Sequence, residues 1–129
     1  DNAGEIVFDK LLLEKISQYD INITVAVKEK PIINDACMED AIDVGLDDFA
    51  RLITTGSDSV GIVESMVSAE FLEYFRNSPF IISKGMGNFE GITEMDLEGQ
   101  DIFVLLCTKC PAISKYLGIK EGSHILKKL

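Results

Sequence analysis

Short apolar runs that alternate with helix-patterned segments constrain the fold of this chain more than any other feature. Residues 21–27 (INITVAV) are uninterrupted and largely β-branched, which is typical of a strand buried in a parallel sheet. Further strands are expected at residues 51–54, 80–83, 101–107 and 124–126, and helices at residues 5–18, 39–44, 68–75 and 111–117. This order predicts an α/β fold, a three-layer sandwich with a mainly parallel, Rossmann-like sheet.

The chain is expected to form one α/β domain over residues 1–129, without repeats or linkers. It opens on Asp1-Asn2-Ala3-Gly4-Glu5, with no methionine and no strand before the first helix. We therefore expect the sequence to be the C-terminal part of a longer chain.

Charge and composition exclude several classes of function. The net charge of −10 disfavours binding to a nucleic-acid backbone, and no apolar run reaches the length of about 18 residues needed to span a membrane. The three cysteines are an odd number, which favours a reducing compartment, and we expect a cytoplasmic protein. A zinc site built on several histidines is excluded within this chain, because it contains one histidine.

Polar residues follow the predicted strands at the edge where parallel sheets bind ligands. These segments are Asp1-Asn2, Asn34-Asp35, residues 55–59 and residues 84–88. Asp1, Asn2 and Asp35 offer only oxygen donors, which suit Mg²⁺ or Mn²⁺ with waters left over for a phosphate. Each segment also has a simpler interpretation: the Asp1-Asn2 pair and Asp35 are ordinary helix-capping residues.

Two further segments are candidates for binding an anionic substrate. Gly56 and Ser57 lie in a loop whose backbone N–H groups are suited to form an anion nest, although such turns usually bind nothing. Lys84 stands at a glycine-rich strand exit, residues 84–90, where an ammonium group can reach a phosphate. A metal ion, a lysine and backbone donors together are a common means of stabilising phosphoryl transfer.

Two alternative functions remain open from the residues alone. Cys107 and Cys110 form a CxxC motif between a predicted strand and helix, as in thiol oxidoreductases, although packed cysteines are the favoured interpretation. A non-enzymatic nucleotide- or metabolite-binding module is the second alternative, although neither GxGxxG nor a P-loop pattern occurs.

Five segments together resemble the metal-dependent damage-control phosphatases, most closely their prokaryotic, archaeal-type branch. The segments are DNAGE (1–5), IINDA (32–36), TTGSDSVG (54–61), SKGMGNFE (83–90) and TKC (108–110). The resemblance implies an α/β domain that follows a mostly helical region in the full protein. It also implies a divalent metal held by Asp1, Asn2 and Asp35, and a phosphate contacted by Lys84 with Asn88 nearby.

The resemblance predicts a phosphomonoesterase that depends on Mg²⁺ or Mn²⁺, with Co²⁺ or Ni²⁺ as alternatives. Its catalytic residues would be Asp1, Asp35 and Lys84. Lys84 and Asn88 would bind the substrate, together with Gly56 and Ser57, which the loop composition suggests. Such enzymes hydrolyse small damaged or surplus metabolites, including sugar phosphates. The substrate, the nucleophile, the oligomeric state and the roles of Glu5 and Asp58 stay unassigned.

Overall fold

The computed structural model of the chain describes residues 2–97 and 99–129. The chain divides into two compact units: a first unit of residues 1–59 and 66–71, and a second unit of residues 60–65 and 72–129. No helix among the described residues is long and apolar enough to cross a membrane.

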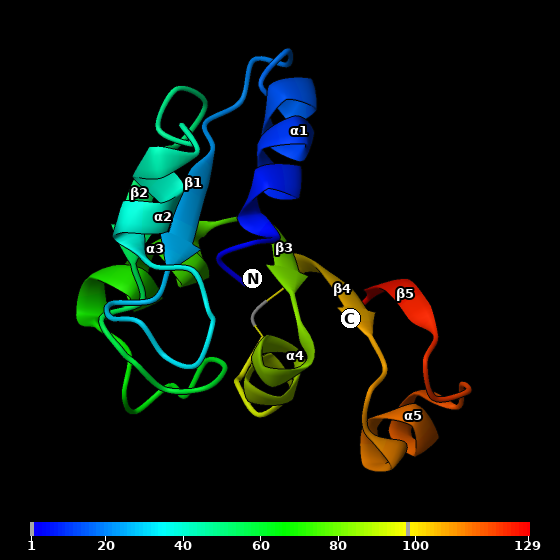
Figure 1. The fold of residues 1–129 in the computed structure, drawn as a ribbon. Helices are drawn as coiled ribbons and strands as arrows, with labels where there is room; N and C mark the ends of the chain where they lie inside the picture. The colour runs from blue at the N-terminus through cyan, green and yellow to red at the C-terminus, as the bar shows by residue number, and fades with distance from the viewer. Residues whose placement is uncertain (1, 98) are drawn as a thin grey trace. The chain divides into compact units, whose positions relative to one another are not determined.

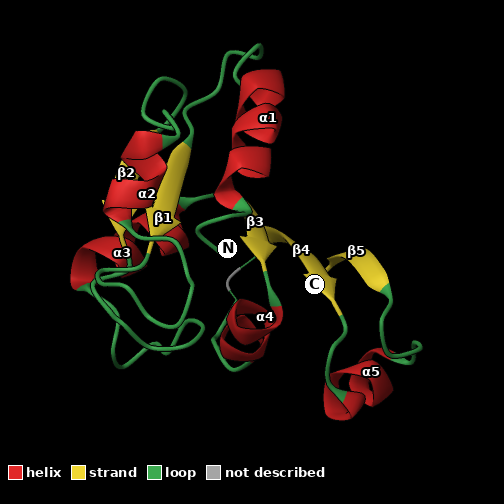
Figure 2. Ribbon diagram, viewed as in Figure 1, coloured by secondary structure: helices red, strands yellow, loops and turns green. Residues whose placement is uncertain are grey.

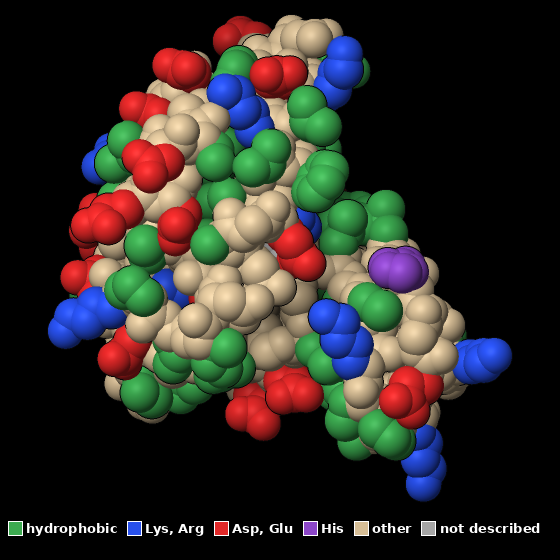
Figure 3. Space-filling view, in the orientation of Figure 1, with side chains coloured by type: hydrophobic (Ala, Val, Ile, Leu, Met, Phe, Trp, Pro, Cys, Tyr) green, Lys and Arg blue, Asp and Glu red, His purple; other side chains and the backbone are tan. Residues whose placement is uncertain are grey.

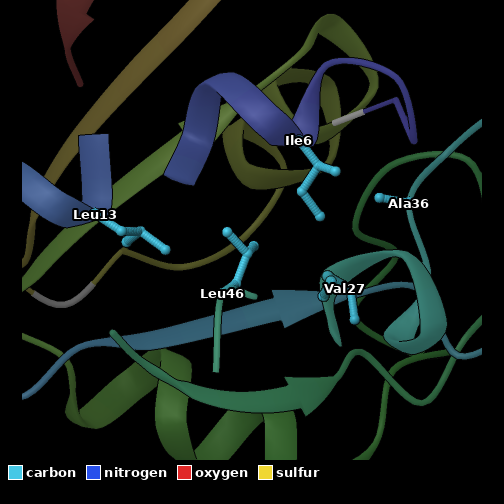
Figure 4. Close-up of a cluster of buried hydrophobic side chains, with 6 residues drawn as sticks. Ile6, Leu13, Val27, Ala36 and Leu46 are labelled. Atoms are coloured by element: carbon cyan, nitrogen blue, oxygen red, sulfur yellow. The ribbon is translucent and has the colours of Figure 1, made fainter. Parts of the chain in front are cut away.

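The first unit pairs two parallel strands with two helices. Its elements are α1 (Ile6–Ile16), β1 (Thr24–Val27), α2 (Met38–Asp43) and β2 (Arg51–Thr54) (Figure 1). The core is one cluster of buried side chains, comprising Ile6, Leu13, Val27, Ala36, Ala41 and Leu46 (Figure 4). This cluster joins α1 and α2 to the end of β1, and therefore fixes the strand end from which the candidate site is built.

The second unit contains a three-stranded mixed sheet. Its elements are β3 (Phe80–Lys84), α4 (Met86–Thr93), β4 (Asp101–Cys107), α5 (Pro111–Leu117) and β5 (His124–Lys128). Strand β3 runs parallel to β4, and β5 runs antiparallel to it (Figure 2). Ile102, Val104 and Leu106 alternate along β4 and are buried, as the period of two in a strand requires.

Helix α3 (Ala69–Asn77) begins in the first unit and continues into the second. The hydroxyl of Ser68 accepts a hydrogen bond from the Phe71 N–H at 3.1 Å. Ser68 is therefore the N-cap of this helix, which was predicted at residues 68–75.

Most predicted elements are confirmed, as are the α/β class and the prevalence of parallel strand pairing. Strand β1 is shorter than predicted and begins at Thr24, whereas β5 extends to Lys128. The four strands that precede β5 form two separate parallel ladders, β1–β2 and β3–β4.

The prediction that residues 84–90 form an open strand exit was wrong, because helix α4 begins at Met86. The two glycines in α4 have low helix propensity, and each destabilises a helix by about 1 kcal/mol relative to alanine. Packing overrides this cost. A Cβ atom on Gly91 would lie 1.8 Å from the Ile62 carbonyl oxygen, and one on Gly61 would lie 2.2 Å from that of Gly87. The glycines let the backbone of α4 lie directly against residues 61–62.

The charged surface agrees with the acidic composition. On the visible face, Asp and Glu side chains are scattered over the molecule, and Lys and Arg side chains do not merge into one basic patch (Figure 3). This is the surface expected for a chain with a net charge of −10.

Candidate functional site

Asn2 and Asp35, two of the three predicted metal ligands, lie opposite each other in the first unit. They form an isolated antiparallel β-bridge, and the Ala3 N–H donates to the Asn34 carbonyl at 2.8 Å. The Asn2 carbonyl accepts the N–H groups of Glu5 and Ile6, which starts α1. The third predicted ligand, Asp1, lies outside the described residues.

The turn before Asp35 carries an unusual backbone conformation. The Asp35 N–H donates to the Ile32 carbonyl at 2.9 Å, which closes a turn over residues 32–35. Ile33 occupies that turn at φ 52° and is 87% exposed. A β-branched residue is strained at positive φ, so the turn is held by the contacts on either side of it. This turn presents Asp35 toward Asn2.

Lys28 lies beside the candidate ligand Asp35 and was not among the residues predicted from the sequence. Its Nζ lies 3.9 Å from Asp35 Oδ2 and donates a hydrogen bond to the Ser59 carbonyl at 2.9 Å. Burial lowers the pKa of Lys28, and the nearby Asp35 carboxylate partly offsets this effect. The available signal was position: Lys28 follows a buried strand at its carboxyl end, as the predicted polar segments do.

The loop that contains Gly56 and Ser57 is tied down by its own threonine and serine side chains. The Gly56 N–H donates to Thr54 Oγ1 at 3.3 Å, and the Ser57 N–H donates to Thr55 Oγ1 at 3.4 Å. The Ser57 hydroxyl is buried and donates to the Ser59 hydroxyl at 2.9 Å. Both backbone donors expected for an anion nest thus have partners in this structure, and their role in substrate binding stays a prediction.

Gly56 is required where it stands. Its φ is +70°, and a Cβ atom there would lie 2.4 Å from Ser68 Cβ. The Ser68 N–H also donates to the Thr55 carbonyl at 2.9 Å, so residues 66–68 lie over this loop. The conformation of this loop therefore requires glycine at position 56, independently of any substrate that binds to the loop.

Lys84 and Asn88 lie in the second unit, at the junction of β3 and α4. Lys84 is the last residue of β3 and is half-buried. The Asn88 side-chain amide donates to the Lys84 carbonyl at 2.8 Å, which fastens the first turn of α4 to the strand end. Gly85 between them has φ +90°, a conformation that glycine readily adopts. The first turn of α4 thus begins two residues after Lys84.

The donor set that the first unit brings together fits a hard divalent cation. Asn2 and Asp35 supply amide and carboxylate oxygens, and Asp35 keeps 29% of its side chain exposed. The nearby soft donor Cys37 is buried, and its thiol donates to Asp40 Oδ2 at 3.1 Å. Among the described residues, no three His, Cys, Asp or Glu side chains gather into a metal cluster; the predicted set combines two carboxylates with an amide and includes Asp1.

Four candidate residues remain, two acidic residues and the two cysteines of the CxxC motif. Glu5 and Asp58 are both exposed. Cys107 ends β4 and Cys110 precedes α5, and both are half-buried free cysteines. The chain after this CxxC motif forms α5 and then β5, antiparallel to β4.

Comparison with known proteins identifies the family. Residues 1–125 match the model of the damage-control phosphatase ARMT1-like domain. The chain is 46% identical over 129 residues to an uncharacterized protein of Methanocaldococcus jannaschii, covering 99% of this chain and 42% of that one. It is 43% identical over 126 residues to a protein of Pyrococcus horikoshii named as a damage-control phosphatase, covering 97% of this chain and 43% of that one.

A solved structure gives the same result for the fold. The crystal structure of a DUF89 family protein from Pyrococcus horikoshii superposes with a TM-score of 0.93 at 41% identity, covering 99% of this chain and 45% of that chain. This chain thus spans less than half the length of the relatives it matches. The resemblance inferred from the five segments is confirmed at the level of the family. The chain belongs to the damage-control phosphatase ARMT1-like domain family.

Proposed function

We propose that this chain carries the metal-binding part of a phosphomonoesterase that acts on small phosphorylated metabolites. The observation that supports this proposal most directly is the backbone bridge that places Asn2 opposite Asp35, two residues with oxygen donors in their side chains, with the buried Lys28 beside Asp35. The names of the relatives supply the phosphatase class. Metal dependence and the kind of substrate are our own inference.

Asp1, Asn2 and Asp35 would hold the cation, Mg²⁺ or Mn²⁺ with Co²⁺ or Ni²⁺ as alternatives. Such an ion supplies concentrated positive charge that polarises a phosphate ester. The chain as a whole is strongly acidic, with a net charge of −10, so an anionic substrate needs local neutralisation. The proposed cation site provides that neutralisation.

Lys84, the last residue of β3, would contact the phosphate. Its ammonium carries the charge, and the first-turn N–H groups of α4, which begins two residues later, also favour an anion. Asn88 would act on the same group by fixing the Lys84 backbone, because its amide donates to the Lys84 carbonyl at 2.8 Å. Gly56 and Ser57 would shape the substrate side of the 55–59 loop.

The test is hydrolysis of a chromogenic phosphate ester by the full-length protein. We expect activity with Mg²⁺, Mn²⁺, Co²⁺ or Ni²⁺ and its loss in EDTA. Asp35→Asn is expected to lower kcat/KM by about a thousandfold or more, because an amide cannot replace the charge that holds the cation. Titration of Mn²⁺ by calorimetry should show a matching loss of affinity.

Asp43→Asn is the matched control, since Asp43 is an exposed carboxylate on α2 in the same unit. It should leave both activity and Mn²⁺ affinity unchanged. Lys84→Ala should weaken substrate binding and turnover while Mn²⁺ affinity stays the same. Normal turnover in Asp35→Asn would remove that residue from the site, and metabolite binding without any metal would favour a non-enzymatic module.

A further inference from the structure

We propose that Lys28 is a positioning residue that orients the Asp35 carboxylate for cation binding and ties it to the 55–59 loop. This inference rests on the proposed metal-dependent function, which assigns Asp35 to the cation. The role goes beyond that function, because Lys28 would act by contacting the metal ligand Asp35 and would not itself bind the cation.

The backbone of Lys28 is fixed from two sides. Its N–H donates to the Ala36 carbonyl at 3.1 Å, and Lys28 forms a parallel bridge with Cys37. On the other side, the Glu29 N–H donates to the Ser57 carbonyl at 3.2 Å. Lys28 therefore lies between the segment that carries Asp35 and the loop that carries Ser57, and the base of its side chain is held in place.

The side chain of Lys28 is buried and directed at both neighbours. It is 8% exposed, and buried lysines are rare unless their charge is paired. The ammonium donates to the Ser59 carbonyl at 2.9 Å and lies 3.9 Å from Asp35 Oδ2. Because the carbonyl bond fixes the nitrogen, the attraction to Asp35 acts along a defined direction.

The Asp35 carboxylate can contact Lys28 and bind a cation at the same time. Its side chain is 29% exposed, so it is reachable from solvent, and a carboxylate offers about four lone-pair sites. Groups that orient a metal ligand in this way typically contribute about 10–100-fold to metal affinity. The contacts of Lys28 include a proposed metal ligand and a loop carbonyl, which is why we assign it a positioning role.

Lys10 offers a matched comparison in the same unit. Its Nζ also donates to a backbone carbonyl, that of Val44, at 2.9 Å, and it lies 5.9 Å from the centre of the Phe49 ring. Removing either ammonium deletes one hydrogen bond of the same kind. Lys28 differs from Lys10 in having its ammonium 3.9 Å from Asp35 Oδ2.

The experiment compares Lys28→Met with Lys10→Met in the full-length protein, using Mn²⁺ alone as the probe. Calorimetry and the electron paramagnetic resonance of bound Mn²⁺ give affinity without reference to activity. We expect Lys28→Met to weaken Mn²⁺ binding by about 10–100-fold. At saturating Mn²⁺, its KM for the chromogenic ester should stay within about twofold while kcat falls. Lys10→Met should lower the melting temperature with unchanged Mn²⁺ affinity.

Unchanged Mn²⁺ affinity in Lys28→Met would overturn the proposal, and so would tighter binding, which would mean that the ammonium only repels the ion. If Lys28→Met does not fold, Lys28→Gln takes its place, because it keeps a donor for the Ser59 carbonyl. Failure of both variants to fold in excess Mn²⁺, with Lys10→Met folded, would make Lys28 a folding residue and overturn the proposal too.

The two proposals fail in different ways. Wild-type protein that binds Mn²⁺ through Asp35 but hydrolyses no ester would overturn the phosphatase function, and the affinity comparison would still decide the role of Lys28. Wild-type protein that binds no Mn²⁺ at all would overturn both.

Discussion

Ile33 holds a backbone conformation that β-branched residues avoid, two positions before Asp35. Its φ of 52° brings Cβ close to backbone atoms, at a cost of roughly 1–2 kcal/mol. Burial of the side chain offsets little of this cost, because Ile33 is 87% exposed. The residue type alone predicts extended backbone. The bridge between Asn2 and Asp35 and the turn bond from Asp35 to Ile32 override that preference. Strain is therefore stored beside the candidate ligand.

Replacing Ile33 with Asn should stabilise the protein by about 0.5–1 kcal/mol, because Asn tolerates positive φ. Urea unfolding, followed by far-UV circular dichroism, measures the change. Ile42→Asn is the control: Ile42 is also exposed, at 52%, but lies in helix α2, where Asn is less favourable than Ile. Equal destabilisation by both substitutions would mean that Ile33 is not strained.

Helix α4 shows how packing can create an element that local sequence opposes. Gly87 and Gly91 are four residues apart and so share one face of the helix. Residues 61–62 approach that face, with Gly87 opposite Gly61 and Gly91 opposite Ile62, while Phe89 and Ile92 of α4 are buried. From the sequence, the glycine-rich segment at residues 84–90 was expected to leave room for a phosphate. Instead, Gly87 and Gly91 allow the backbone of residues 61–62 to pack directly against α4.

Gly91→Ala should destabilise the second unit by about 1–3 kcal/mol or more, because its Cβ would lie 1.8 Å from the Ile62 carbonyl oxygen. Thermal unfolding and hydrogen exchange of residues 86–93 would report the loss. In the control, Gly4→Ala, the new Cβ meets no atom within 4 Å, and stability should be nearly unchanged. A neutral Gly91→Ala would contradict the close packing of α4.

At the scale of the whole molecule, the predicted metal ligands that the structure describes belong to the first unit. Asn2 and Asp35 both lie there, together with Lys28 and the 55–59 loop. A ligand that binds only the folded state stabilises the residues whose order it requires, by about 2.7 kcal/mol at 100 times its dissociation constant. The effect of a cation should therefore appear first in one part of the chain.

Hydrogen exchange read by mass spectrometry should show this division. Adding Mn²⁺ in the absence of phosphate is expected to slow exchange in peptides that cover residues 2–6, 28–37 and 54–59. Peptides of β4 and β5 should be unaffected, and Asp35→Asn should abolish the response. Protection that spreads equally over both units would show that the cation acts on the chain as a whole.

The sequence predicted all five strands and every helix except α4, because the β-branched run before Lys28, the apolar run of β4 and the serine at position 68 are local signals. It also identified Asp35 as a candidate, because a polar residue after a buried strand can be read along the chain. The tertiary structure was needed to establish that Asn2 lies opposite Asp35, that Lys28 is buried beside Asp35, and that α4 is a helix. These depend on contacts between segments far apart in sequence, where burial and backbone approach outweigh local preference.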